Sequence, residues 1–272
     1  MNKTYKLILF LAISLGVSVF LLKDSSFMRK IVPVGNELDF SQQQVEKIEN
    51  IIHNYILNNP DVLLEANKKI QEQEIDKQRI QLEQIKDKIA VRKEQIFAED
   101  NLGRIVLGNP DGDIIIATFT QHQCPACKKT NLIMDEIIEA NPKIKSLVIY
   151  WPFLGEDAIY SAKAVIAAKQ QNKEQLLNRL IFNDPEIVNK EHLNKIIADH
   201  PEIDGQALKE AIENESLNEA LVNNSKLSEE LALGGTPALV IANRELSRIV
   251  FVPSYTENLK EDILQAIESI KN

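Results

Sequence analysis

Apolar and polar residues divide the chain into three regions with different periodicities. In the first region, an uncharged apolar run at residues 7–22 follows Lys3 and Lys6 and ends at Lys23. A basic start followed by an apolar stretch is typical of an export signal, and the stretch is near the lower limit for a membrane-spanning helix. We therefore predict that residues 1–26 are a signal peptide or a membrane anchor, with both alternatives open.

Residues 36–100 form a polar region in which apolar residues recur at helical spacing. Ser41 and Gln44 have the spacing of a capping box, which predicts that a helix begins at this point. Apolar residues then follow three and four positions apart until the sequence Asn58-Asn59-Pro60 ends the helix. A second helix is predicted from Pro60 to about residue 97.

Four apolar residues of the second helix lie seven positions apart: Ile75, Leu82, Ile89 and Ile96. Ile85 occupies an intermediate heptad position. A narrow apolar seam on a long charged helix favours a coiled coil between copies of the chain. The alternative is a helix whose apolar residues pack on the neighbouring domain. We predict homo-oligomerisation through residues 36–100.

The third region, residues 103–272, alternates strand and helix patterns. A continuous β-prone run at residues 113–120 precedes the sequence Cys124-Pro125-Ala126-Cys127, and a helix at 128–140 and a strand at 145–151 follow. Residues 153–233 have helical periodicity, and a β pattern returns at 238–241 and 247–252 before a last amphipathic helix. The order predicts an α/β domain with a helical insertion.

The two cysteines are the strongest chemical signal. The predicted order of elements places Cys124 at a helix N-terminus, where unpaired amides and the helix dipole lower the pKa of a thiol. Cys127, one turn later, is expected to be buried and to act as the resolving thiol. A metal site is the rival chemistry for this spacing, but it normally needs four ligands, and beyond His122 the other histidines have no paired spacing. We expect no metal and no cofactor.

Composition and charge argue against two further classes, nucleic-acid-binding proteins and disulfide scaffolds. The chain has 272 residues and a net charge of −9, which argues against nucleic acid as a partner because phosphates are held by basic patches. Two cysteines cannot form a disulfide scaffold. Export and a lone Cys-x-x-Cys pair together indicate redox chemistry outside the cytoplasm.

The Cys-Pro-Ala-Cys motif after a strand and Gly235-Thr236-Pro237 before a later strand resemble the DsbA family of thiol-disulfide oxidoreductases. The helical N-terminal region makes the chain most similar to exported members with an oligomerisation segment, of the ScsC type. The resemblance implies a thioredoxin fold with a helical insertion over residues 103–272. It also implies that Thr236 and Pro237 bind substrate, with Pro237 as a cis-proline.

The resemblance also implies that Pro125 and Ala126 modulate the redox pair. His122, two residues before Cys124, either modulates the pair or lies on a loop surface. Strongly oxidising members have histidine where Ala126 stands, so we expect a lower reduction potential here. Many relatives have a buried carboxylate where Thr118 stands, so proton transfer to Cys127 must differ.

We therefore predict an oxidoreductase that forms or isomerises disulfides in exported proteins, periplasmic or tethered to the inner membrane. Its expected partners are exported substrates with cysteines and an envelope redox partner. The alternative is an envelope scaffold without enzymatic activity, in which the cysteines form a structural disulfide or a metal clip.

Overall fold

The computed structural model describes residues 40–99, 103–253, 256 and 258–271. The predicted signal or anchor at residues 1–26 lies outside this part of the chain. No helix within the described ranges is both long enough and apolar enough to cross a membrane.

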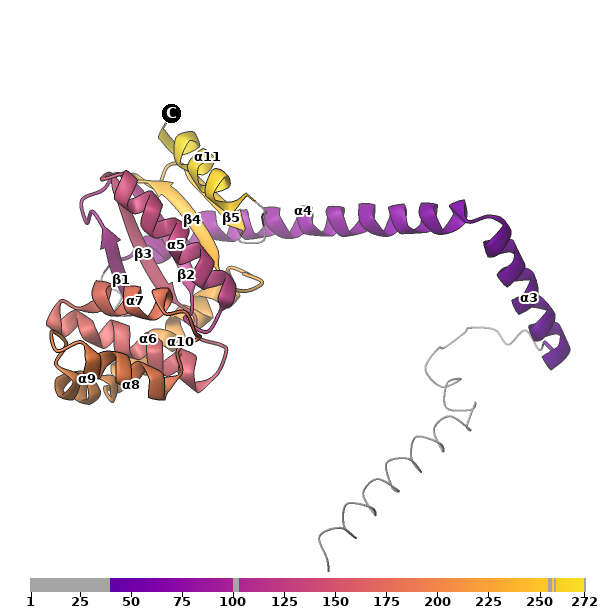
Figure 1. The fold of residues 1–272 in the computed structure, drawn as a ribbon. Coiled ribbons are helices and arrows are strands. Elements are labelled where there is room, and N and C mark those ends of the chain that lie inside the picture. The colour runs from indigo at the N-terminus through magenta and orange to yellow at the C-terminus, as the bar shows by residue number, and fades with distance from the viewer. Residues whose placement is uncertain (1–39, 100–102, 254–255, 257, 272) are drawn as a thin grey trace, which may run out of the picture. The chain divides into compact units, whose positions relative to one another are not determined.

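Two helices occupy the polar region, and both match the predicted bounds. Helix α3 spans Gln42–Asn58 and helix α4 spans Asp61–Phe97 (Figure 1). The Ser41 backbone N–H donates to Gln44 Oε1 at 2.9 Å, so one half of the predicted capping box is visible at the start of α3. The chain divides into two compact units at Glu72, which places the boundary inside α4.

The second unit, from Gln73 onward, is built on a five-stranded sheet of order β1-β3-β2-β4-β5. Strands β2 and β3 are parallel, and the other neighbouring pairs are antiparallel. Every residue of β2 and β3 is buried, as the continuous apolar run predicted for a central strand. The strands are β1 (Arg104–Gly108), β2 (Ile114–Thr120), β3 (Ile144–Tyr150), β4 (Ala238–Asn243) and β5 (Ile249–Pro253).

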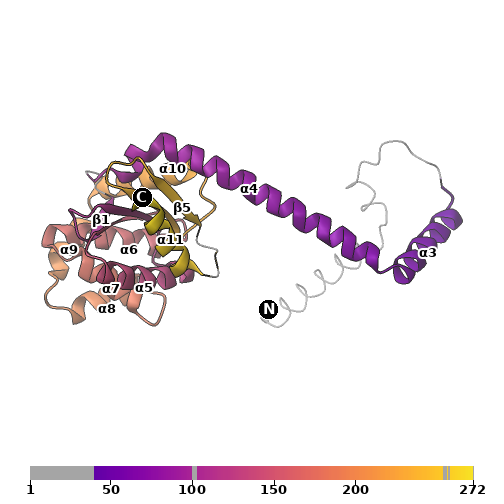
Figure 2. The ribbon, with the colours of Figure 1, turned by 90° about the horizontal axis from the view of Figure 1, so that it is seen from above.

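Helices cover both faces of the sheet, because alternate residues of each strand point to opposite sides. One face of β2, with Ile114 and Ile116, packs against helices α5 (Pro125–Ala140) and α11 (Leu259–Lys271). The other face, with Ala117 and Phe119, packs against α4 and the end of α10 (Figure 2).

The C-terminal half of α4 belongs to this second face. Ile85, Ile89 and Ile96 are 6%, 2% and 0% exposed and pack on the sheet, whereas Ile75 is 63% exposed. Ile85, Ile89 and Ile96 therefore pack on the neighbouring domain, which was the alternative to a coiled coil. Oligomerisation through this region stays a prediction that depends on residues N-terminal to them.

Polar contacts fix α4 to the sheet. The buried Arg104 guanidinium donates to the Ile96 and Gln95 carbonyls, each at 2.7 Å, and so stabilises the last turn of the helix. The Lys93 ammonium group donates to the Leu246 carbonyl at 2.9 Å. These contacts hold the last turns of α4 against β1 and the loop that follows β4.

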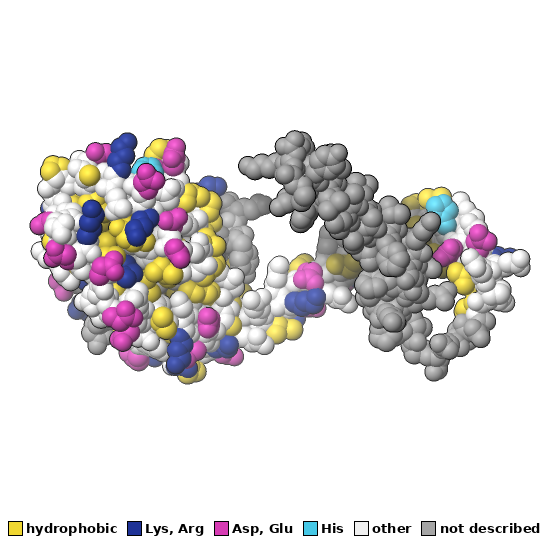
Figure 3. Space-filling view, turned by 90° about the horizontal axis from the view of Figure 1, so that it is seen from below, with side chains coloured by type: hydrophobic (Ala, Val, Ile, Leu, Met, Phe, Trp, Pro, Cys, Tyr) yellow, Lys and Arg dark blue, Asp and Glu magenta, His cyan; other side chains and the backbone are white. Residues whose placement is uncertain are grey.

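The helical insertion follows β3, and its core is shared with Ile105 and Leu107 of β1 and with Val148 and Tyr150 of β3. The element order and the mixed sheet confirm the predicted α/β class with a helical insertion. Figure 3 shows acidic and basic side chains interspersed on one face of the molecule. The insertion comprises α6 (Glu156–Ala167), a 3-10 turn (Ala168–Gln171), α7 (Glu174–Asn183), α8 (Lys190–Asp199), α9 (Gly205–Ile212) and α10 (Glu215–Glu230).

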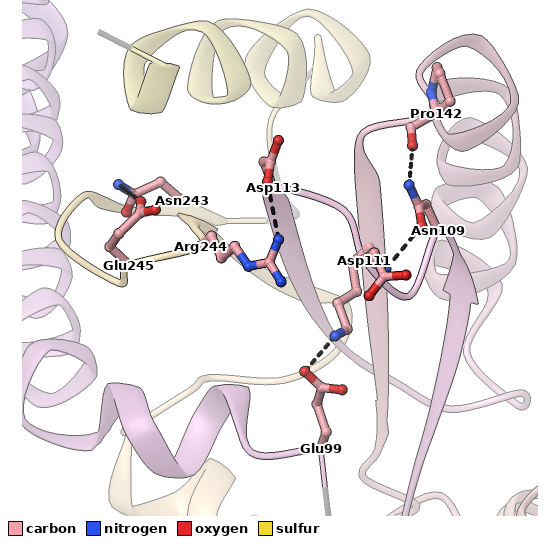
Figure 4. Close-up of polar contacts among 9 residues, drawn as sticks. Glu99, Asn109, Asp111, Asp113, Pro142, Asn243, Arg244 and Glu245 are labelled. Atoms are coloured by element: carbon pink, nitrogen blue, oxygen red, sulfur yellow. Dashed lines mark hydrogen bonds and ion pairs between the residues drawn. The ribbon is translucent and has the colours of Figure 1, made fainter.

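The end of the sheet where β2 begins is closed by polar contacts (Figure 4). Asn109 Nδ2 donates to the Pro142 carbonyl at 2.8 Å, and Asn109 Oδ1 accepts from the Asp111 N–H at 2.9 Å. Arg244 pairs with Asp113 at 3.5 Å. The cysteines lie beyond the opposite end of β2.

Candidate active site

Cys124 is the N-cap residue of α5, and its sulfur accepts a hydrogen bond from the Cys127 N–H at 3.2 Å. Pro125 follows at the first helical position, where the missing N–H costs nothing and the fixed φ suits the helix. Both cysteines are free thiols, and Cys124 is 8% exposed whereas Cys127 is 1% exposed. The junction between β2 and α5 therefore leaves Cys124 slightly accessible to solvent and buries Cys127.

The surroundings separate the pKa values of the two thiols. Hydrogen bonding from the Cys127 thiol is the main cause that lowers the pKa of Cys124 to about 6, with burial opposing it and the Cys127 N–H, the Thr236 hydroxyl and the Ala126 N–H assisting. Burial raises the pKa of Cys127 well above its usual value. Cys124 is thus the thiol that ionises near neutral pH, while Cys127 holds its proton.

The loop before β4 brings a distant part of the chain to this thiol. The Thr236–Pro237 peptide bond is cis. The Cys124 thiol donates to the Thr236 carbonyl at 3.4 Å, and Gln121 Nε2 donates to the Thr236 hydroxyl at 3.0 Å. The structure therefore brings together Cys124, Cys127, Thr236 and Pro237, the catalytic and substrate-binding residues expected from the sequence.

Pro125 and Ala126, the two residues between the cysteines, are exposed. Ala126 reaches the Cys124 sulfur only through its backbone. Neither residue between the cysteines therefore brings a cationic side chain to the thiolate.

His122 is buried, so the loop-surface alternative does not hold. Its Nδ1 lies 3.1 Å from Ser161 Oγ and its Nε2 lies 3.4 Å from Asn178 Oδ1, which also accepts from the Tyr150 hydroxyl at 2.6 Å. The His122 ring stacks at a tilt on Phe182, which itself packs on both cysteines. His122 thus joins the cysteine loop to the helical insertion.

Burial lowers the pKa of His122 from 6.5 to about 3, with the Asn178 hydrogen bond opposing the shift. The folded protein therefore leaves this ring neutral where the unfolded chain protonates it, so stability is retained above pH 6.5 and falls as the pH drops below it. Between pH 7 and pH 5 this effect is worth about 2 kcal/mol.

We expect His122→Gln to remove that part of the pH dependence. Urea unfolding of reduced wild-type and variant protein at pH 7 and pH 5 measures it, since the difference between their pH slopes cancels the contribution of Cys124. His53→Gln, at an exposed position, is the control. Equal slopes in the wild type and His122→Gln would contradict the assignment of His122 as a buried neutral ring.

Behind Cys127 lies a small cavity of about 10 Å³. Thr118, Thr120 and Thr130 contribute hydroxyl groups to its lining, and Cys127 is the only ionisable group there among the described residues. The Thr118 hydroxyl is buried and has no hydrogen-bond partner among the residues that the structure describes. The described lining of this cavity therefore offers hydroxyl groups and no carboxylate to the Cys127 thiol.

The sequence did not indicate which residues form hydrogen bonds with the loop between β2 and Cys124. Gln121, Tyr150, Ser161 and Asn178 are buried polar residues of this site, and three of them lie in segments far from the cysteines. The available signal was the polar pair Gln121 and His122 directly after an apolar strand. Within the described residues, no group of three or more His, Cys, Asp or Glu side chains is placed so that it could hold a metal ion.

Comparisons with known proteins agree with this geometry. The thioredoxin family model matches residues 100–263. No curated protein sequence matches the chain.

Solved structures share the fold at low sequence identity. A thioredoxin-like oxidoreductase from Silicibacter pomeroyi is 23% identical with a TM-score of 0.58, over 65% of this chain and 96% of that one. A linker-deletion variant of ScsC from Proteus mirabilis is 17% identical with a TM-score of 0.59, over 87% and 99%. The thiol-disulfide exchange protein alpha-DsbA2 from Wolbachia pipientis is 21% identical with a TM-score of 0.56, over 68% and 95%. The family match and these structures confirm the thioredoxin fold that the resemblance implied.

Proposed function

Because the chain belongs to the thioredoxin family, we propose that it is a thiol-disulfide oxidoreductase acting through Cys124 and Cys127. The observation that carries the proposal is the hydrogen bonding of the Cys124 sulfur, which accepts from Cys127 at a helix N-terminus and lies 3.4 Å from the Thr236 carbonyl. The activated Cys124 thiol thus lies beside the Thr236 backbone, which can form hydrogen bonds with a substrate peptide.

The exchange proceeds in two displacements. The Cys124 thiolate attacks one sulfur of a substrate disulfide, a Cys124–substrate bond forms, and the other substrate sulfur leaves as a thiolate that takes a proton from water. The Cys127 thiol then passes its proton to water and attacks the Cys124 sulfur, which forms the Cys124–Cys127 disulfide and releases the second substrate sulfur as a thiolate that takes a proton from water. The substrate gains two electrons and the protein loses two; the reverse sequence oxidises a substrate.

Reduction of insulin by dithiothreitol tests this activity, with protein lacking residues 1–26. We expect the wild type to accelerate the reaction and the Cys124→Ser, Cys127→Ser double variant to leave it at the uncatalysed rate. Equal rates for both proteins would instead support an envelope scaffold with a structural disulfide or metal clip.

Within this activity we favour disulfide isomerisation in exported proteins. Ala126 places no cation beside the thiolate, so the reduced form is less stabilised and the potential is lower than that of a strong oxidant. Clustering of several active sites by oligomerisation would also help to rearrange incorrect disulfides. We further propose a periplasmic location, reached by export through residues 1–26 with or without retention as an anchor, and an envelope protein as redox partner.

Exposed apolar residues on α3 support the oligomer. No residue of α3 is buried within the described chain, although Ile48, Ile51 and Ile52 lie on its apolar face and are 39%, 60% and 52% exposed. An apolar face of this kind is stable in water when a second copy covers it.

We expect residues 41–272 to sediment as a dimer or trimer and residues 73–272, a compact unit with its own core, as a monomer. The double variant Ile48→Glu, Ile52→Glu should also be monomeric, because it places charges on the apolar face. Glu49→Ala, His53→Ala has the same spacing and serves as its control. A monomer at high concentration with all of residues 41–272 present would refute this role of the region.

A further inference from the structure

Gln121 is a buried residue whose amide joins three segments around the redox pair. It follows β2 directly, and its backbone carbonyl accepts from the Cys124 N–H at 3.4 Å. Its side-chain oxygen accepts from the Leu154 N–H at 3.1 Å, and its side-chain nitrogen donates to the Thr236 hydroxyl at 3.0 Å. Because Gln121 is 0% exposed, bulk water does not compete for these two hydrogen bonds.

The backbone N–H of Leu154 determines which way round the Gln121 amide lies. A backbone N–H only donates, so the side-chain atom that faces it must be Oε1. The atom that faces Thr236 is therefore Nε2, which also only donates. The Thr236 hydroxyl oxygen thus accepts from Gln121, and its single proton remains for another acceptor.

Two sulfur atoms lie within reach of that proton. The Cys127 thiol gives the largest lowering of the Cys124 pKa, and the Thr236 hydroxyl adds to it through a hydrogen bond of its own. The same hydroxyl also forms a hydrogen bond with Cys127. A thiolate only accepts, and a bond to an ionised acceptor is stronger than one to a neutral acceptor. The hydroxyl proton therefore stabilises the thiolate most when it points at the Cys124 sulfur.

Neutral donors supply the hydrogen bonds at the Cys124 sulfur. The ammonium group of Lys128 donates instead to the Glu186 carbonyl at 3.0 Å. Burial lowers the pKa of His122 to about 3, so that ring is neutral as well. Stabilisation of the thiolate then depends on the direction in which each neutral donor points, because a dipole that turns away from the charge no longer stabilises it.

We propose that Gln121 is a positioning residue for the redox reaction: its amide donates to the Thr236 hydroxyl and so keeps the hydroxyl proton directed at the Cys124 sulfur. The inference rests on the proposed function and identifies a residue that acts on the nucleophile through another side chain. It also gives the entry to the helical insertion a part in the reaction, because the Leu154 N–H holds the amide in this orientation.

The pKa of Cys124, read from the ultraviolet absorbance of its thiolate in reduced protein, tests this role. Gln121→Met has a similar length and no donor, so the Thr236 hydroxyl is free to turn away. We expect the ionised fraction of Cys124 at pH 5 to fall about fivefold. Gln121→Glu keeps an acceptor for the Leu154 N–H and presents a second acceptor to Thr236, so it should lower the fraction further. Cys124→Ser provides the absorbance background.

A double-mutant cycle separates this role from a loss of packing. In Thr236→Val, which lacks the hydroxyl, adding Gln121→Met should leave the ionised fraction unchanged. In Thr236→Ser, which keeps a hydroxyl, the effect of about fivefold should return. Gln123→Met is the matched control, because this glutamine lies in the same loop and donates to the Val188 carbonyl at 2.9 Å. It should keep the wild-type pKa of Cys124.

Equal effects of Gln121→Met with and without the Thr236 hydroxyl, or the same loss in Gln123→Met, would overturn the assignment. If Gln121→Met does not fold, Gln121→Glu makes the same comparison: its effect should be smaller in Thr236→Val, and an equal effect would also overturn the assignment. These readouts need no substrate. A protein that shows the coupling between Gln121 and Thr236 but fails to accelerate insulin reduction would therefore contradict the proposed function alone.

Discussion

Cys124→Ser should lower the protein-catalysed part of insulin reduction by about a thousandfold or more, because a serine hydroxyl does not ionise near neutral pH and cannot replace the thiolate. Cys127→Ser should also lose turnover but for a different reason. It keeps the Cys124 nucleophile and lacks the thiol that attacks the mixed disulfide, so covalent complexes with substrate should accumulate.

Non-reducing gel electrophoresis after incubation with scrambled ribonuclease distinguishes the two variants. We expect a band of protein linked to substrate for Cys127→Ser, which disappears on reduction, and no such band for Cys124→Ser. The double variant provides the control for non-specific thiol pairing. Complexes that form through Cys127 when Cys124 is absent would reverse the assigned roles.

The sequence predicted the elements well because their signals are local. The apolar run of β2 is continuous, and a strand buried on both faces requires this pattern. Ser41, Asn59 and Pro60 mark helix ends through their own backbone chemistry, and the structure places the ends of α3 and the start of α4 beside them. Cys124 at a helix N-terminus followed from the strand-motif-helix order alone.

The partner of an apolar surface could not be predicted in the same way. Ile85, Ile89 and Ile96 have heptad spacing, but a sheet face satisfies such a seam as well as a second helix does, and here the sheet covers them. His122 is buried by Ser161 and Asn178, which lie 39 and 56 residues away. Contacts over such separations leave no mark in the local pattern.

The cause of the low thiol pKa also differs in part from the expectation. The sequence argument rested on helix amides and the dipole, whereas the structure adds a larger contribution from the Cys127 thiol. Cys127→Ala should therefore raise the pKa of Cys124 above its wild-type value, because the alanine keeps the N–H donor and removes the S–H donor.

The reactivity of the two thiols should differ by a large factor at mildly acidic pH. With a pKa of about 6, Cys124 is half ionised at pH 6, whereas an ordinary cysteine thiol with a pKa of about 8.5 is ionised to less than about 1%. Cys127, whose pKa is raised by burial, should react more slowly still. Iodoacetamide should thus label Cys124 nearly exclusively at pH 6.

The pH profile of Cys124 alkylation in the reduced wild-type protein tests the central claim most directly, with each cysteine followed by mass spectrometry. The account predicts a midpoint near pH 6 for Cys124 and no labelling of Cys127 until the protein unfolds. A midpoint near pH 9 for Cys124, or earlier labelling of Cys127, would contradict it.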